Sequence, residues 1–424
     1  MKNTRHWKKS LVEKMVNLDE LEELLRSGKD EEAYKQIKGD RGITAEILIN
    51  EGIFFGTLED NSISISYFKL AEKIAEGDEI IERVRVNMAV SYNNRGNAYY
   101  ELKKQEKAIE DYNKAIELNP EDAMAYNNRG AAYAKLKKQE KAIEAYNKAI
   151  ELNPEDATAY NNRGTTYYEL KKQEKAIEDY NKAIELNPGY AMAYNNRGNA
   201  YAKLKKQEKA IEDYNKAIEL NPEDATAYNN RGTTYDELKK QEKAIEDYNK
   251  AIERNPEFAT AYYNRGNAYA ELKKYEKAIE DYNKAIELNP EYAMAYANRG
   301  ITCLISNEDL YKAIDDFKCA RDFFEGKDKE MMLGFKEWAE ARNAMNLKNW
   351  VGFRERMNES KEYFDKINDP LSHSLDAFIK ISYLDEELDQ ALSSYDPIEA
   401  SEKIETALKN LPEVEGLIDP ERTI

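Results

Sequence analysis

Residues 89–122 read AVSYNNRGNAYYELKKQEKAIEDYNKAIELNPED, and close copies of this stretch follow it along the chain. The Arg-Gly pair of the unit recurs at a step of 34 residues, from positions 95 and 96 to positions 299 and 300. A fixed period of this length is the sequence signature of a repeat architecture. Each unit has two helical stretches around a polar Lys-Lys-Gln turn, and an Asn-Pro pair ends the second stretch because proline disfavours helix at the preceding residue. The pattern predicts an all-α array of helix-turn-helix repeats.

The composition narrows the classes of function. At 424 residues the chain is too long for one ordinary hydrophobic core, which agrees with an array. Its 64 Lys and Arg against 82 Asp and Glu give a net charge of −18, which disfavours nucleic acid and anionic membranes as general partners. Two histidines and two cysteines argue against a disulfide scaffold, a zinc centre or a His-dependent active site. We therefore expect a non-catalytic protein without a cofactor or a metal.

No targeting signal is recognisable in the sequence. The N-terminal stretch MKNTRHWKKSLVEKM is basic but lacks the apolar run of a secretory signal. No segment approaches the ~20 apolar residues that a membrane span needs. We expect a soluble cytoplasmic protein.

The repeated unit resembles the tetratricopeptide repeat (TPR). In the first copy, the small and aromatic positions of that family fall on Tyr92, Gly96, Tyr99, Ala108, Tyr112, Ala115 and Pro120. The resemblance implies a right-handed superhelical solenoid with helical caps, in which the first helix of each repeat (helix A) lines the concave face. It also implies a scaffold that binds protein partners.

The period divides the chain into four parts. We expect a helical cap over 1–44, with a hairpin over 11–38 that breaks at Gly28. A degenerate repeat follows over 45–88, and its final segment, 79–88, lengthens the next helix A. Seven repeats then span 89–122, 123–156, 157–190, 191–224, 225–258, 259–292 and 293–328, the last with a one-residue insertion in its turn. An acidic helical region over 329–424 has expected helices at 330–346, 349–367, 371–392 and 397–411, and serves either as a cap or as a docking module.

Three positions in the repeats carry residues that need either a bonding partner or burial in the core. Arg95 and its copies stand where the family usually has a large apolar residue, and a half-buried guanidinium needs a carboxylate or carbonyl groups. We expect Glu110 and its copies to be these partners. Cys303 and Cys319 fall within the helices of the last repeat, where we expect both to be small buried hydrophobic residues.

Asparagines gather on one face of helix A. At 100° per residue, Asn93, Asn94 and Tyr100 lie on the side opposite Tyr92 and Gly96, so the resemblance places them in the concave groove. An amide offers a donor and an acceptor to any peptide group. If helices A stack about 10 Å apart and an extended strand rises about 3.3 Å per residue, one asparagine meets roughly every third peptide bond. This arrangement resembles the asparagine ladders with which some superhelical TPR proteins hold a peptide backbone.

The predicted ligand is therefore an extended peptide of a partner protein. The predicted peptide-binding residues are Asn93, Asn94, Asn127, Asn128, Asn161, Asn162, Asn195, Asn196, Asn229, Asn230, Asn264, Asn298, Tyr100 and Tyr168. Selectivity would come from groove positions that vary between repeats, namely Tyr100-Glu101, Ala134-Lys135, Tyr168-Glu169, Ala202-Lys203, Asp236-Glu237 and Ala270-Glu271.

Three alternatives stay open at this point. The asparagines can instead hydrogen-bond one another within the solenoid. The protein can be a signalling regulator that responds to a bound peptide by changing its superhelical pitch. The lysine-rich turns form a basic rim that can hold single-stranded RNA, although glutamates alternate with these lysines.

Overall fold

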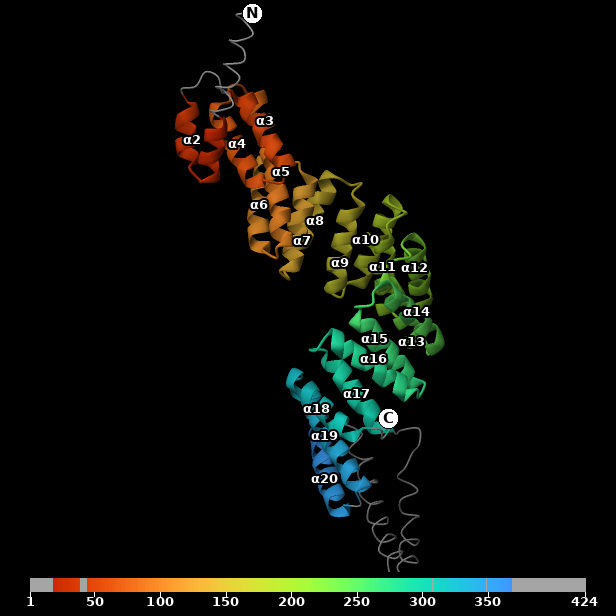
Figure 1. The fold of residues 1–424 in the computed structure, drawn as a ribbon. Coiled ribbons are helices and arrows are strands. Elements are labelled where there is room, and N and C mark those ends of the chain that lie inside the picture. Colours follow the sequence, from red (N-terminus) through yellow and green to blue (C-terminus); the bar gives the residue numbers. More distant parts are fainter. Residues whose placement is uncertain (1–17, 39–43, 307–308, 348, 368–424) are drawn as a thin grey trace, which may run out of the picture. The chain divides into compact units, whose positions relative to one another are not determined.

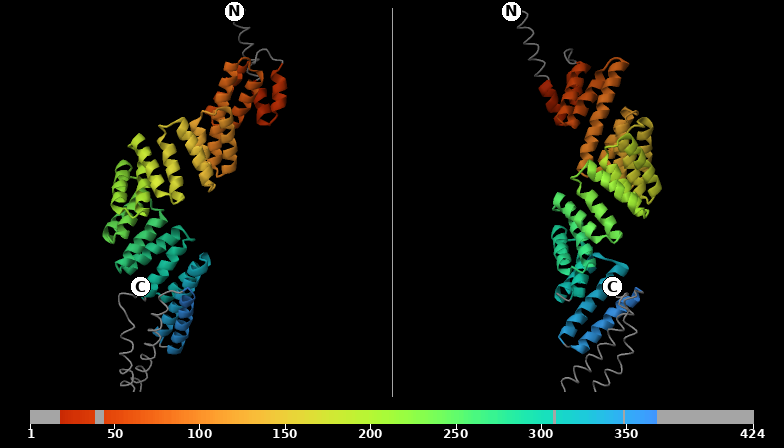
Figure 2. Two further views of the ribbon diagram at one scale, coloured as in Figure 1. Left: turned by 180° about the vertical axis from the view of Figure 1, so that it is seen from behind. Right: turned by 90° about the vertical axis from the view of Figure 1, so that its right-hand side faces the viewer.

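The computed structural model describes residues 18–38, 44–306, 309–347 and 349–367, and every regular element in them is an α-helix (Figure 1). This confirms the all-α prediction. The chain falls into two compact units, residues 1–220 and 221–424. Within each unit, consecutive helices pair as antiparallel hairpins, which the two further views in Figure 2 also show. The helices expected at 371–392 and 397–411 lie outside the described residues.

Among the described residues of the first unit, the first helix covers residues 18–26, and the chain then turns at Gly28, where φ is +73°. The long helix α5 has 24 residues and includes the segment 79–88. The helices of this unit are α2 (Asp30–Ile37), α3 (Ala45–Thr57), α4 (Asn61–Ile74), α5 (Asp78–Glu101), α6 (Gln105–Leu118), α7 (Ala123–Lys135), α8 (Gln139–Leu152), α9 (Ala157–Glu169), α10 (Gln173–Leu186), α11 (Ala191–Lys203) and α12 (Gln207–Leu220).

The second unit continues the same hairpins and then leaves the repeat pattern. Its helices are α13 (Ala225–Glu237), α14 (Gln241–Arg254), α15 (Ala259–Glu271), α16 (Tyr275–Leu288), α17 (Ala293–Ser306), α18 (Leu310–Phe323), α19 (Gly326–Asn346) and α20 (Trp350–Lys366). The last two correspond to the helices expected at 330–346 and 349–367. After the insertion in the turn of the seventh repeat, Ala313, Phe317 and Ala320 lie in the core, each 0% exposed.

Local sequence sets where the repeat helices begin and end. The Asp122 side chain caps α7 by accepting hydrogen bonds from the backbone N–H groups of Met124 and Ala125, at 3.0 and 3.2 Å. Between the two helices of a repeat, the chain turns through a residue in the left-handed region, such as Lys103 with φ of 57°. In the first six copies, a left-handed lysine therefore separates the two helices at the same position of the repeat.

A glycine and a tyrosine hold the two helices of a repeat together. Tyr112 on α6 is 1% exposed and lies directly against Gly96 on α5. A Cβ atom added to Gly96 would lie 2.6 Å from the Cε1 atom of Tyr112, closer than carbon atoms approach. The close approach of the paired helices therefore requires glycine on helix A.

The repeated arginine binds aspartate, so the expectation for Glu110 is wrong. Arg95 donates to both carboxylate oxygens of Asp111 through its Nε and Nη2 atoms, at 2.7 and 2.8 Å. Glu110 is exposed. One residue changes the direction of a helical side chain by about 100°, so Asp111 faces helix A and Glu110 faces solvent. The same bidentate ion pair joins Arg163 to Asp179, Arg197 to Asp213, Arg231 to Asp247, Arg265 to Asp281 and Arg299 to Asp316.

These arginines also connect successive repeats. The Nη1 atom of Arg163 donates to Asn147 on the second helix (helix B) of the preceding repeat, at 2.7 Å. Arg197 contacts Asn181 in the same way, at 2.7 Å. Arg163 and Arg197 thus each bond a carboxylate of their own hairpin and an amide of the previous one.

The two cysteines differ in burial. Cys303 is buried, as predicted, whereas Cys319 is exposed, so the prediction for Cys319 is wrong. Cys319 follows the exposed Lys318 on α18, while Phe317 and Ala320 take the core positions of that helix. The buried face of α18 therefore includes Phe317 and Ala320 but not Cys319.

Arg129 lacks the aspartate partner of the other repeat arginines, because Ala145 occupies the position of that aspartate. Its Nη1 atom donates to Asn113 at 2.9 Å, but its buried Nε atom has no hydrogen-bond partner. We predict that Ala145→Asp restores the pair and stabilises the protein by about 1 kcal/mol. Thermal unfolding checks this, with Asp179→Ala as the reciprocal change that should lower the melting temperature. A lower melting temperature for Ala145→Asp would show that the site has no room for the carboxylate.

Candidate functional site

The asparagines of helix A form two series that differ in burial. The inner series begins with Asn93 and is almost wholly buried, with Asn93 4% and Asn161 2% exposed. The other members of the inner series are Asn127, Asn195 and Asn229, which are 7 to 9% exposed. The outer series, one residue later, is half-buried from Asn128 onward, and its first member, Asn94, is exposed. A ligand can therefore reach the outer series more readily than the inner one.

Within each unit, outer asparagines reach back to the preceding repeat. The Nδ2 atom of Asn128 donates to the Oδ1 atom of Asn93, at 3.1 Å. The same bond joins Asn162 to Asn127 at 3.2 Å, Asn196 to Asn161 at 3.1 Å and, in the second unit, Asn264 to Asn229 at 3.0 Å. The asparagines thus form a ladder of amide hydrogen bonds between repeats. This is the internal hydrogen bonding that the sequence alone could not distinguish from ligand binding.

The ladder changes its partners near the end of the array. Tyr263 stands at the inner position of the sixth repeat, and Asn298 donates to its hydroxyl oxygen at 3.0 Å. Asn298 also donates to Asn267 at 2.8 Å. Asn267 belongs to a third position, first occupied by Asn97, which accepts from Asn128 at 3.1 Å and from the hydroxyl of the core Tyr112 at 2.8 Å.

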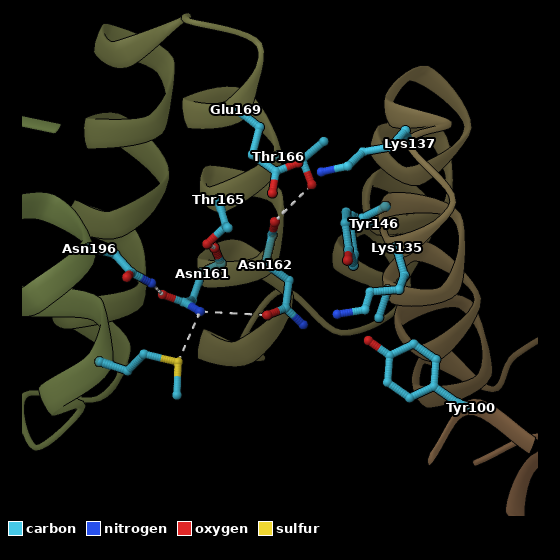
Figure 3. Close-up of a pocket in the computed structure, with 13 residues that line it drawn as sticks. Tyr100, Lys135, Lys137, Tyr146, Asn161, Asn162, Thr165, Thr166, Glu169 and Asn196 are labelled. Carbon is cyan, nitrogen blue, oxygen red and sulfur yellow. Dashed lines mark hydrogen bonds between the residues drawn. The ribbon is translucent and has the colours of Figure 1, made fainter. Parts of the chain in front are cut away.

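A cavity of about 530 Å³ lies on this helix-A face in the first unit (Figure 3). Its size falls within the range of small-molecule and peptide side-chain pockets. Four predicted site residues line it, namely Tyr100, Asn161, Asn162 and Asn196. The remaining lining residues are Ala131, Ala134, Lys135, Lys137, Tyr146, Thr165, Thr166, Glu169 and Met192.

Repeat 2 creates this cavity because its two groove positions carry alanine. Ala131 stands where the first repeat has Asn97, and Ala134 stands where it has Tyr100. The neighbouring repeats fill these places with larger side chains, such as Thr165 and Tyr168. Two small residues in a single copy therefore open the space.

Several polar groups in the cavity keep hydrogen-bonding capacity. The Nδ2 atom of Asn161 has only long contacts, at 3.5 Å to the Oδ1 atom of Asn162 and at 4.0 Å to the sulfur of Met192. The hydroxyl of Thr165 donates to the backbone carbonyl of Asn161 and accepts from the hydroxyl of Tyr180 at 3.3 Å, so one of its two acceptor positions remains for a ligand. Burial raises the pKa of Tyr100 above its usual value, so its hydroxyl stays protonated at neutral pH.

Other predicted site residues do not line the cavity. Tyr168 is half-buried with its pKa raised by burial, and it does not line the cavity. Asn195 and Asn230 make interactions of their own. The sequence predicts Lys135 only as a variable groove position and does not predict Lys137 or Thr165 as site residues. The available signal was the pair of alanines in repeat 2, which follows only from comparing the copies position by position.

The helix-A face of the second unit carries different chemistry. Asp236 occupies the position of Tyr100, and its buried Oδ1 atom has no hydrogen-bond partner. The neighbouring Glu271 accepts from Lys239 at 3.2 Å and from Gln241 at 2.5 Å. Burial, with a smaller contribution from the charge of Glu271, raises the pKa of Asp236 to about 6.

The structure also bears on metal binding and on membrane insertion. Within the described residues, no group of three or more His, Cys, Asp or Glu side chains could hold a metal ion. None of the helices that the structure describes is both long enough and apolar enough to cross a bilayer.

Comparison with known proteins identifies the family. The family described as tetratricopeptide repeat matches residues 123–156, 157–190, 191–224, 225–258 and 259–292, and the family described as TPR repeat matches residues 96–137. No curated protein matches the chain significantly. The chain belongs to the tetratricopeptide repeat family, whose members are typically non-catalytic and bind other proteins.

Solved structures of other TPR proteins resemble parts of the chain. YrrB, described as a TPR protein with an unusual peptide-binding site, is 30% identical over 43% of this chain and 95% of its own, with a TM-score of 0.36. MamA is 28% identical over 39% of this chain and 96% of its own, with a TM-score of 0.35. A TPR protein from Parabacteroides merdae is 22% identical over 61% of this chain and 98% of its own, with a TM-score of 0.45.

The raised pKa of Asp236 predicts a pH-dependent stability. The folded state holds this proton more tightly than the unfolded chain, whose aspartates titrate near 4. The stability from the neutral form is complete below that value and is lost as pH rises through about 6. Asp236→Asn should therefore stabilise the protein by about 1 kcal/mol at pH 7.5, after discounting for solvent screening, and give almost no gain near pH 4.

Melting temperatures at the two pH values measure this effect. Glu246→Gln, at an exposed position on the adjacent helix α14, serves as the control for loss of one negative charge. An equal gain for Asp236→Asn at both pH values would contradict the expectation.

Proposed function

We propose that the protein is a binding scaffold that holds an extended peptide of a partner protein along its helix-A face. The observation that carries the proposal is the cavity in the first unit, because amides from successive repeats line it together with a tyrosine. An extended peptide has a donor and an acceptor at each residue, and amides can meet both. The TPR family typically mediates protein interactions, which agrees with such a ligand.

The inter-repeat ladder determines which amide atoms a peptide would meet. The Nδ2 atom of Asn128 is committed to two acceptors, Asn93 and Asn97, so its Oδ1 atom remains for a ligand. The inner Asn161 has the converse arrangement, because its Oδ1 atom accepts from Asn196 while its Nδ2 atom has only long contacts. An outer carbonyl would then accept from a peptide N–H, and an inner amide would donate to a peptide carbonyl.

The ladder also fixes these amides in place before a ligand arrives. Asn128, Asn162 and Asn196 each bond to a buried asparagine, so their rotamers are already selected when the peptide docks. Preorganisation of this kind lowers the entropic cost of binding. At about 0.5–1.5 kcal/mol for each hydrogen bond, several repeats together would give useful affinity with modest sequence selectivity.

Two matched triple variants test the proposal. Replacing Asn128, Asn162 and Asn196 by alanine removes the outer series, and replacing Asn93, Asn127 and Asn161 removes their buried partners. Both triples delete the three bonds between inner and outer asparagines, and the outer triple also deletes the bond from Asn128 to Asn97. We therefore expect losses of stability of about 3 kcal/mol for the inner triple and about 4 kcal/mol for the outer triple. The outer triple should weaken peptide binding at least tenfold more than the inner triple does, because the outer amides have greater access to a ligand.

The measurement uses the full-length chain on an array of ten-residue peptides with acetylated and amidated ends. Melting temperatures of both triples confirm that they remain folded at the assay temperature. Equal binding by the wild type and the outer triple would overturn the proposal, and so would the absence of any bound peptide on the array.

A further inference from the structure

We propose that the cavity in the first unit recognises an acidic side chain of the bound peptide through Lys135, Asn162 and Tyr100, which we call the acid subsite. This inference rests on the proposed peptide-binding function and adds to it the chemistry of one ligand residue. All three side chains line the cavity and point toward one another (Figure 3).

Asn162 has a hydrogen-bond donor left over because of Ala131. In the first repeat, Asn97 accepts the second hydrogen of Asn128, at 3.1 Å. Ala131 occupies the equivalent place below Asn162 and has no acceptor to offer. The Asn162 amide donates only to Asn127, at 3.2 Å, among the described residues. The alanine that opens the cavity thus also leaves an amide hydrogen free within it.

Lys135 supplies a positive charge that the protein does not neutralise. It is exposed at the last position of α7, and no ion pair joins it to a carboxylate within the described chain. The acid that also lines the cavity, Glu169, accepts a hydrogen bond from Gln139 at 3.1 Å. A second lysine, Lys137, lines the same wall. In a chain of net charge −18, this cavity has two lysines against one glutamate.

The third donor is the Tyr100 hydroxyl, which has no hydrogen-bond partner in the part of the chain that the structure describes. An ammonium, an amide N–H and a phenol converge on one space, and a carboxylate can accept all three bonds. Charge-assisted bonds of this kind are about twice as strong as neutral ones. A glutamine has the same shape but lacks the charge, so it would lose most of this interaction.

The experiment compares peptides that differ at one central residue. The tightest binder from the capped array is made with Glu, Gln, Lys or Ala at the central position, and each form is titrated against the full-length chain. The Glu form should bind about tenfold more tightly than the Gln form. Lys135→Gln should abolish this preference, whereas Lys203→Gln, the equivalent exposed residue of α11 outside the cavity, should leave it intact.

Ala131→Asn provides an independent variant, because the new side chain fills the cavity and gives Asn162 its missing acceptor. It should remove the preference for Glu without lowering the melting temperature. A wild type that binds the Glu and Gln forms equally, or prefers Lys, would overturn the acid subsite while leaving peptide binding in place. So would a preference that survives Lys135→Gln, or one that needs a free peptide C-terminus rather than a side chain. No binding by any form would instead refute the proposed function.

Discussion

The packing of one buried aromatic ring against one glycine is the interaction on which each repeat depends, with tyrosine in the first six repeats and Phe317 in the seventh. Gly96 allows the ring of Tyr112 to approach α5 so closely that even a methyl group would collide with it. The tyrosine hydroxyl must then find an acceptor, because a buried polar group without one is costly. It reaches through the hairpin to Asn97 on the helix-A face, at 2.8 Å. Core packing and groove chemistry are therefore linked within one repeat.

Polar bonds add to the apolar contacts that connect the repeats, such as the cluster that joins Ile109 and Tyr112 of the first repeat to Ala132 of the second. Alanines such as Ala108 and Ala125 fill much of the core at 0% exposure, and small side chains bury little apolar surface. Arginines bonded to aspartate and asparagine join neighbouring hairpins through helix B. Asparagines bonded to asparagines join them through helix A. Both networks use the same residue types in nearly every copy.

The fold could be predicted from the sequence because the 34-residue period and the helix boundaries are local features. The pairing of side chains between helices could not. The choice between Glu110 and Asp111 depends on the rotation of one helix against another, which a period does not fix. The burial of Asn93 depends on the next repeat, since its side chain lies under Asn128. The cavity depends on two alanines in one copy, and averaging the copies into a consensus hides them.

The central claim is that the helix-A amides hold the backbone of a peptide, and methylation of the peptide nitrogen tests it most directly. Each residue of a bound ten-residue peptide is replaced in turn by its N-methyl form, which removes one N–H donor but keeps the side chain. Titration against the full-length chain should show losses of about tenfold, equal to 1.4 kcal/mol, at roughly every third position along the peptide. Equal affinity for all the N-methyl forms would contradict the claim, because recognition would then depend on side chains alone.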